Sequence, residues 1–161
     1  EYLDGDPQSL NADGIVHLCI GTAADPEKPF GADNLIIRTP LALDAPSGAL
    51  MFPGGGLHTG QRIRMTRRDP EQIRRTAVAC AKALIAGEAN APALVLQFDC
   101  AGRGKVMFGC GADDHIFTPL RSVIGTQVPW VGFHTYGEIA ETKLGLRYHN
   151  YSVALCGLYD H

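Results

Sequence analysis

The sequence predicts an α+β fold with a mixed, largely antiparallel sheet and two main helices. The expected elements run strands, helix, strand, helix and two further strands, which is not the regular alternation of a parallel α/β fold. Glycine and proline account for 19 and 10 of the 161 residues, so we expect short elements joined by many loops. Apolar residues make up 45% of the chain, enough to form a packed core.

Residues 1–34 are dominated by turn-forming sequence, with Asp, Asn, Gly and Pro clustered at 4–7, 11–14, 25–26 and 31–34. One short apolar run, Ile15–Ile20, interrupts them and is a candidate strand. We therefore interpret 1–34 as a linker or the end of a preceding domain, and 35–161 as the α+β domain. The chain begins at Glu1 without a methionine, which suggests a piece of a longer protein.

Two strands and a turn are expected next. Leu35–Leu43 is rich in branched residues, but Pro40 removes a donor from the ladder, which favours an edge strand or a bulge. The segment Asp44–Gly48 is typical of a hairpin turn and leads into a strand at Ala49–Phe52.

From Arg62 the sequence alternates, with Ile63 and Met65 on one face of a predicted half-buried strand. A helix follows, because Asp69 is a suitable N-cap, Pro70 fits the first helical position and Gln72 completes a capping-box-like pattern. Apolar residues then recur at helical spacing, and a glycine follows that could end the helix: Ile73, Ala77, Cys80, Ala81, Leu84 and Gly87.

The second half of the chain predicts a buried strand, a helix and two more strands. Ala93–Phe98 is nearly all apolar, as expected of a central strand covered on both faces. A helix is expected within Asp114–Ile124, where Pro119 either kinks it or starts it with Thr118 as the cap. The last strands are expected at Val128–Thr135 and Arg147–Tyr159.

Composition excludes several classes of partner. With 14 basic and 17 acidic residues the net charge is −3, so the chain lacks the basic excess of a nucleic-acid-binding protein. No apolar run approaches the roughly 20 residues that cross a bilayer, and no signal peptide opens the sequence. Five cysteines without a C-x-x-C pair favour reduced thiols, and hence a cytoplasmic protein.

Nucleotide and metal templates do not fit the polar segments. The sequence Gly102-Arg103-Gly104-Lys105-Val106-Met107 lacks both the third glycine of a dinucleotide loop and the Ser/Thr of a P-loop. The cysteines and histidines that a zinc site would need are scattered over the chain, at Cys100, Cys110, His115, His134 and His149. We therefore predict no metal site.

Cys100 is the strongest catalytic candidate. It follows a buried strand and is close in sequence to Arg103, which could lower its pKa, while His134 and Glu138 could act as base and orienting group. A cysteine after such a strand is more often a small core residue, so we expect no catalytic residue.

Arg103, between two glycines, suits a ligand carboxylate or phosphate because the backbone around it is free to approach and the guanidinium is a planar fork. Equally, Arg103 could pair with Asp99 or Glu138 to fix the loop. Glu138 could hold a ligand amino group or be that partner, and Asn150 could bind a ligand or satisfy nearby backbone groups.

Three motifs resemble the C-terminal domain of the FIST family. The segment 96–104 (LQFDCAGRG) is similar to its "cysteine, small, Gly, Arg" turn. The segment 128–139 (VPWVGFHTYGEI) resembles its "Pro-x-x-Gly-Phe-x-Thr-x-Gly-Glu-Ile" signature, and 149–153 (HNYSV) its closing "His-Asn-x-Ser/Thr" strand. The resemblance covers about residues 35–159.

The resemblance implies an intracellular sensory domain of signal transduction, found in bacteria beside signalling output domains and in eukaryotes with F-box proteins. It implies a small polar ligand, amino acids among the candidates, and a partner N-terminal FIST domain. Carrying the motifs onto this chain gives the predicted ligand-binding residues Cys100, Gly102, Arg103, Tyr136, Gly137, Glu138, His149 and Asn150.

The leading hypothesis is therefore a non-enzymatic sensory domain without a cofactor. Three alternatives stay open: an enzyme that uses Cys100, a haem-binding gas sensor with His134 or His149 as axial ligand, and a protein-interaction scaffold whose motif residues are structural.

Overall fold

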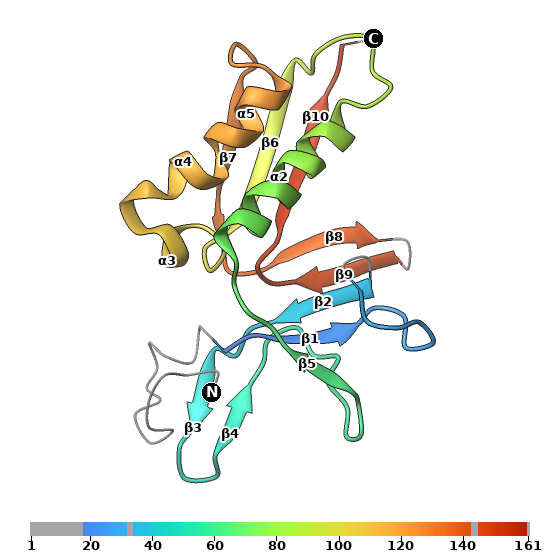
Figure 1. Cartoon of the computed structure of the whole chain (residues 1–161), viewed down its shortest axis with the longest axis vertical. Coiled ribbons are helices and arrows are strands. Elements are labelled where there is room, and N and C mark those ends of the chain that lie inside the picture. Colours follow the sequence, from blue (N-terminus) through green and yellow to red (C-terminus); the bar gives the residue numbers. More distant parts are fainter. Residues whose placement is uncertain (1–17, 32–33, 143–144, 161) are drawn as a thin grey trace. The chain divides into compact units, whose positions relative to one another are not determined.

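The computed structural model describes residues 18–31, 34–142 and 145–160. The chain divides into two compact units, residues 1–67 (unit 1) and 68–161 (unit 2) (Figure 1). The turn-rich stretches at 4–7 and 11–14, and most of the expected strand Ile15–Ile20, lie outside the described residues. No helix in the described ranges is both long and apolar enough to cross a membrane.

Unit 1 contains a three-stranded antiparallel sheet and a hairpin. The sheet has the order β2-β1-β5, and the hairpin joins β3 to β4. The bounds are β1 Ile20–Ala23, β2 Leu35–Arg38, β3 Ala42–Asp44, β4 Ala49–Met51 and β5 Ile63–Met65. The predicted domain boundary after residue 34 stays a prediction, although β1 and β2 on its two sides are hydrogen-bonded neighbours.

Local sequence explains most of unit 1. Pro40 separates β2, an edge strand, from β3, as its missing donor predicts. The expected hairpin turn forms, with Gly48 in the left-handed region at φ 70°. The strand at 63–65 forms too, but the expected burial of Ile63 and Met65 is wrong: they are 51% and 38% exposed. The described residues of unit 1 contain no α-helix that could cover this edge strand.

Unit 2 begins with helix α2, Pro70–Leu84. The Asp69 side chain accepts a hydrogen bond from the Gln72 backbone N–H at 3.0 Å, and Pro70 occupies the first turn, so the predicted cap is confirmed. The helix ends at Leu84, before the glycine expected to terminate it. Its buried residues are Ala77 and Ala81, small side chains that allow a close approach to the sheet.

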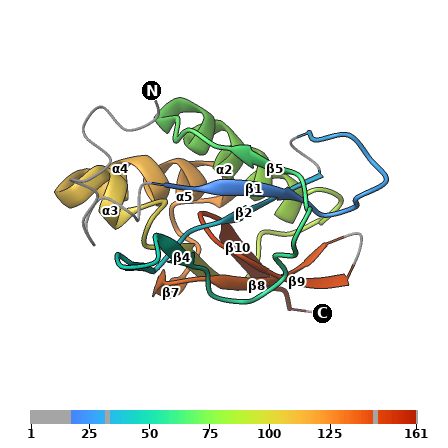
Figure 2. The ribbon, with the colours of Figure 1, turned by 90° about the horizontal axis from the view of Figure 1, so that it is seen from below.

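The central sheet of unit 2 has the order β10-β6-β7, with β6 at Leu94–Cys100, β7 at Trp130–Thr135 and β10 at Val153–Leu158. Strand β6 pairs parallel with β7 and antiparallel with β10. Helices α2, α4 and α5 lie on one side of this sheet (Figures 1 and 2). The core lies beneath them and consists of Ala77, Ala81, Val95, Leu120, Ile124 and Val128.

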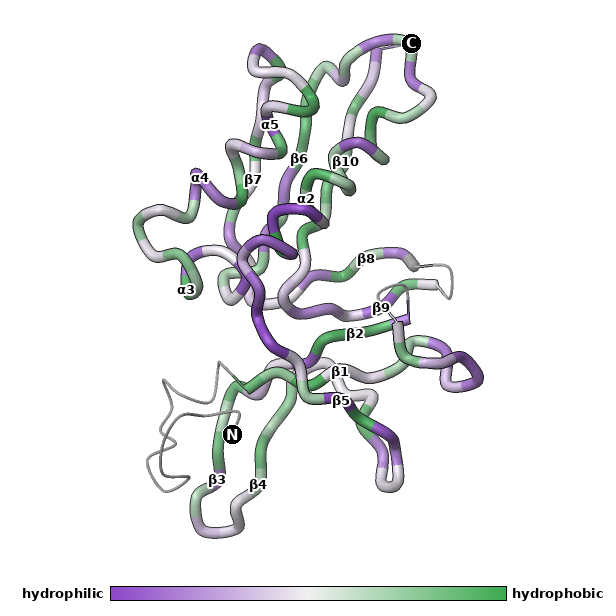
Figure 3. The backbone as a smooth tube through the Cα atoms, in the orientation of Figure 1, coloured by the Kyte–Doolittle hydropathy of each residue, from purple (hydrophilic) through white to green (hydrophobic). Residues whose placement is uncertain are grey.

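Strand β6 is central as predicted, but its two faces differ. Val95, Gln97 and Asp99, which alternate along the helix-covered face, are buried. The residues on the other face are only half-buried: Leu94, Leu96 and Phe98. The prediction that both faces of this strand are buried is therefore wrong. Figure 3 shows hydrophilic colour only in the carboxyl half of the strand, where Gln97 and Asp99 alternate with hydrophobic residues.

The expected helix within 114–124 is two helices. After the short α3 (Lys105–Phe108) and a 3-10 turn (Gly109–Gly111), α4 spans Ala112–Ile116 and α5 spans Thr118–Ile124. Pro119 lies in the first turn of α5, so the expectation that it starts a helix, rather than kinks one, is confirmed. The expected Thr118 cap is wrong, because Phe117 is the N-cap residue and Thr118 is already helical.

The connection after β7 contains an unexpected hairpin of β8 (Glu138–Thr142) and β9 (Gly145–His149). The expected strand Arg147–Tyr159 is accordingly broken between β9 and β10. The break contains Tyr151, whose φ of 57° is left-handed and ends the extended conformation. The α+β prediction is confirmed, with β6 and β7 the parallel pair among otherwise antiparallel pairs of described strands.

Candidate functional site

The polar residues at the carboxyl end of β6 lie on opposite faces of its sheet. Asp99 faces the helices and is paired in register with His134 of β7, whereas Cys100 faces the other way and is paired with Thr135. The polar groups therefore form two separate sets, the Asp99 pocket and the Glu138 cluster.

Arg103 belongs to the Asp99 side. Its Nη1 donates to Asp99 Oδ2 at 2.5 Å, and its Nη2 donates to the backbone carbonyl of Ile73 at 3.3 Å. Both side chains of the ion pair are only 3% exposed. The turn after β6 positions Arg103, since the N–H groups of Arg103 and Gly104 both donate to the Cys100 carbonyl at 3.0 Å. Of the two structural partners considered, Asp99 is the one that Arg103 contacts.

One oxygen of Asp99 carries all of its described hydrogen bonds. Oδ2 also accepts from Gln97 Nε2 at 3.3 Å, whereas Oδ1 is buried and has no hydrogen-bond partner among the described residues. Burial raises the pKa of Asp99, and the Arg103 guanidinium opposes that shift. Because a guanidinium cannot be deprotonated in a protein, Arg103 supplies a fixed positive charge beside Oδ2, which favours the ionised form of this carboxyl.

A pocket of about 290 Å³ lies beside these groups, and we call it the Asp99 pocket. Strands β6 and β7 form one wall, and residues at and after α4 form the other. Gln97 Oε1 and Trp130 Nε1 are, like Asp99 Oδ1, buried without a hydrogen-bond partner in the described part of the chain. The lining residues are Gln97, Asp99, Asp113, Ile116, Phe117, Trp130, Val131, Gly132, Phe133 and His134.

The Glu138 cluster consists of Cys100, Thr135, Glu138 and Ser152. Glu138 is 3% exposed, accepts a short hydrogen bond from the Thr135 hydroxyl and accepts another from Ser152 Oγ at 2.7 Å. Burial raises the pKa of Glu138, and these hydrogen bonds, with one from the Cys100 thiol, partly offset the shift. The cluster thus satisfies the carboxylate with neutral donors rather than with a cation.

Cys100 does not have the surroundings of an activated nucleophile. It is 4% exposed, and burial together with the neighbouring Glu138 raises the pKa of its thiol. The net shift is therefore upward, against the expectation: the Arg103 guanidinium faces Asp99 on the other side of the strand, and of the groups of Arg103 only the backbone N–H lowers the Cys100 pKa. A protonated, buried thiol is a weak nucleophile.

Tyr136, Tyr148 and Asn150 extend from the Glu138 side. Tyr148 Oη donates to the Tyr136 carbonyl at 3.1 Å, and Asn150 Nδ2 approaches the same carbonyl at 3.4 Å. Asn150 is buried, whereas the Tyr136 side chain is 80% exposed. His149 is paired in register with Glu138 and is half-buried. The described residues contain no group of three or more His, Cys, Asp or Glu side chains arranged to hold a metal ion.

A family model described as "FIST C domain" matches residues 1–141 of the chain. The chain belongs to the FIST C domain family. This family consists of sensory domains of signal transduction. The match includes the segments 96–104 and 128–139, which carry the resemblance, and stops before 149–153. No curated protein and no solved structure matches the chain.

The glycines of the FIST C motifs lie where the chain has no room for a side chain. A Cβ on Gly132 would collide with the backbone carbonyl of Gln97 in β6. One on Gly102 would lie 2.7 Å from the Tyr151 ring, and one on Gly137 would collide with Tyr148. These positions allow close approach of neighbouring segments, which is a structural use of the glycine.

The residues predicted to bind ligand in this FIST C domain divide between the two sides. The Glu138 side contains Cys100, Tyr136, Gly137, Glu138, His149 and Asn150. Arg103 lies on the other side, and Gly102 lies in the turn that follows β6. The sequence analysis missed Gln97, Asp113 and Trp130 as pocket residues. A polar Gln97 within an otherwise apolar strand segment was a usable signal, because buried polar groups need partners.

Proposed function

We propose that this FIST C domain senses a small polar ligand bound in the Asp99 pocket. The main support for this proposal is that Asp99 Oδ1 and Gln97 Oε1 are buried at the pocket wall without hydrogen-bond partners among the described residues. An unsatisfied buried polar group costs about 1–3 kcal/mol, so a ligand that supplies donors recovers that cost on binding. The volume of about 290 Å³ is at the small end for ligand pockets and suits a small metabolite, amino acids among the candidates.

In this proposal the domain acts inside the cell with other domains. An N-terminal FIST domain is its expected partner, and a signalling output domain or an F-box-type protein receives the signal. The proposal includes no catalytic step and no cofactor. The buried, protonated thiol of Cys100 supports the proposal that the domain performs no catalytic step.

Intrinsic fluorescence tests the proposal directly, because Trp130 is the only tryptophan of the chain and lines the pocket. Titration with a panel of small polar metabolites should change the emission with a saturable curve for at least one compound. Calorimetry should give the same dissociation constant. A Trp130→Phe variant should lose the optical signal, with calorimetry deciding whether it still binds.

A compound that binds by calorimetry but leaves Trp130 emission unchanged would place the ligand elsewhere and contradict the assignment of the pocket. A panel in which no compound binds would contradict the proposed sensing of a small polar ligand by this domain.

A further inference from the structure

The side chains that line the Asp99 pocket include more acidic groups than basic ones. Asp99 and Asp113 are acidic, and His134 is the one lining side chain, among the residues that the structure describes, able to carry positive charge. Arg103 does not line the pocket. Its Nη1 donates a hydrogen bond to Asp99, and its Nη2 donates one to the Ile73 carbonyl. A ligand carboxylate would therefore meet the exposed Asp113 and the unpaired oxygen of Asp99, while the guanidinium that balances Asp99 stays outside the pocket lining.

The unpartnered atoms favour a ligand that donates. Asp99 Oδ1 and Gln97 Oε1 are both acceptors, and Asp99 and Gln97 lie two residues apart on the same face of β6. A protonated amine has two or three donors and a positive charge, so it satisfies both oxygens and complements Asp99. Asp99 and Gln97 are 2% and 8% exposed, so water does not compete freely for these oxygens.

Aromatic side chains supply the remaining wall. Trp130 and Phe117 pack edge to face with ring centroids 5.4 Å apart, and both line the pocket. Such rings attract an organic cation and cover an apolar body. Trp130 Nε1 is a neutral donor without a partner, which suits an uncharged oxygen of the ligand, such as an amide carbonyl or a hydroxyl.

We propose that the ligand is a small organic cation: an amine that carries a neutral oxygen acceptor and an apolar body, and no carboxylate. This inference rests on the proposed function, since it names the chemical class of the ligand in the same pocket. Under this proposal the pocket binds amines and amino-acid amides more tightly than it binds the amino acids themselves.

Matched compounds test it on the full chain. For each standard amino-acid side chain, Trp130 fluorescence and calorimetry would compare the amino acid, its carboxamide, the decarboxylated amine and the deaminated acid. Within a set the apolar body is constant and only the charged groups change. For the best side chain we expect the carboxamide to bind about ten-fold or more tightly than the amino acid, and the deaminated acid not to bind.

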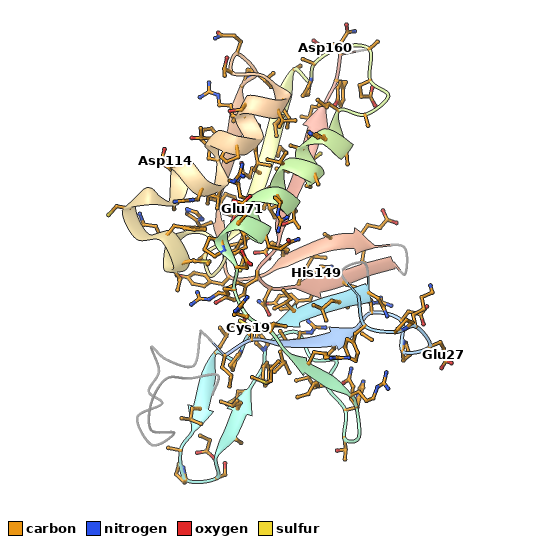
Figure 4. The ribbon with its side chains drawn as sticks, viewed as in Figure 1. Cys19, Glu27, Glu71, Asp114, His149 and Asp160 are labelled. Atoms are coloured by element: carbon orange, nitrogen blue, oxygen red, sulfur yellow. The ribbon has the colours of Figure 1, made fainter. Side chains whose placement is uncertain are left out.

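Asp113 gives a variant that leaves the buried ion pair intact, because it is exposed at the pocket rim. Asp113→Lys should lower the carboxamide-to-amino-acid affinity ratio about two-fold to five-fold. Asp114→Lys makes the same charge change on the neighbouring residue, which projects outward from α4 and does not line the pocket (Figure 4). It should leave the ratio unchanged.

The outcomes distinguish the two levels of the proposal. Amino acids or deaminated acids that bind as tightly as the carboxamides would overturn the cationic ligand while leaving the sensing pocket in place. Failure of every compound in every set would overturn both. An equal response of the ratio to Asp113→Lys and Asp114→Lys would also contradict the recognition of charge at the rim.

Discussion

At the scale of single residues, the ion pair of Asp99 and Arg103 decides which carboxylate oxygen is left for a ligand. Arg103 and Gln97 both bond Oδ2, so Oδ1 remains without a partner. The pair is buried, and the desolvation of two charges is offset only while both are present. We therefore expect substitution of either member to affect folding as well as the proposed ligand binding.

Arg103→Ala should lower the free energy of unfolding by about 3–5 kcal/mol, because it leaves the buried Asp99 carboxylate without its cation. Arg103→Lys keeps the charge but loses the fork that reaches both Asp99 and the Ile73 carbonyl, so a smaller loss is expected. Urea denaturation would measure both. Arg74→Ala is the control, because its ion pair with Glu71 is exposed to solvent, and it should leave the free energy of unfolding almost unchanged. A loss this small for Arg103→Ala would contradict a structural role for Arg103.

Glu138 makes the free energy of unfolding fall as pH rises, whereas a carboxylate whose pKa is lowered by an ion pair makes it rise. Its pKa is raised in the folded state, so the folded protein binds more protons than the unfolded chain above the ordinary value of 4.5. The free energy of unfolding then falls as pH rises from that value through the raised pKa. Glu138→Gln removes this contribution.

The stability difference between Glu138→Gln and the unsubstituted chain should therefore shift in favour of the variant as the pH rises from about 4 toward neutrality. Denaturation at a series of pH values would measure it. Comparing the two proteins at each pH cancels the contribution of Asp99, whose pKa burial also raises. A difference that is constant with pH would show that Glu138 has the same pKa in both states.

At the scale of secondary-structure elements, the parallel pair β6 and β7 builds the pocket wall. Its register places His134 opposite Asp99 and Gly132 opposite Gln97. The glycine is required because the Gln97 carbonyl occupies the space of its missing Cβ, and backbone atoms move less easily than the end of a flexible side chain.

Gly132→Ala should destabilise unit 2 by roughly 1–3 kcal/mol, since the added methyl forces β7 away from β6. It should also weaken ligand binding, because Trp130 and His134 move with β7. Thermal melts and Trp130 emission would record both effects. Gly111→Ala is a matched control, because a Cβ there meets nothing within 4 Å. If the two variants melt alike, the close approach of β7 to β6 is not as described.

At the scale of the whole molecule, the division into units assigns the Asp99 pocket, the Glu138 cluster and the helix-covered core to residues 68–161. Unit 1 contains separate β-structure with its own hydrogen-bonded register. A domain with its own core can in principle fold alone.

We predict that residues 68–161 expressed alone fold and bind the same compounds as the full chain, with dissociation constants that agree within about three-fold. Circular dichroism would follow folding, and Trp130 fluorescence would follow binding. A fragment that folds but does not bind would show that the ligand also needs unit 1. A fragment that does not fold would contradict the independence of its core.

The sequence by itself determined the elements whose causes are local. The Asp69 cap with Pro70, the turn at 44–48 and the interruption at Pro40 each depend on residues a few positions apart, and all three formed as predicted. The family, too, was recognisable from contiguous motifs. The hairpin of β8 and β9 was missed because its strands are stabilised by pairing with each other rather than by an apolar pattern of their own.

Only the tertiary structure decided the partner of Arg103 and the place of the pocket. The sequence left both Asp99 and Glu138 open as structural partners of Arg103, because spacing alone does not tell which face of the sheet a turn returns to. Neighbouring strand residues point to opposite faces, so the turn after Cys100 brings Arg103 to Asp99 while Glu138 meets Cys100 on the other side. Which buried atoms remain unpaired depends on all of these contacts together, and no local pattern encodes that.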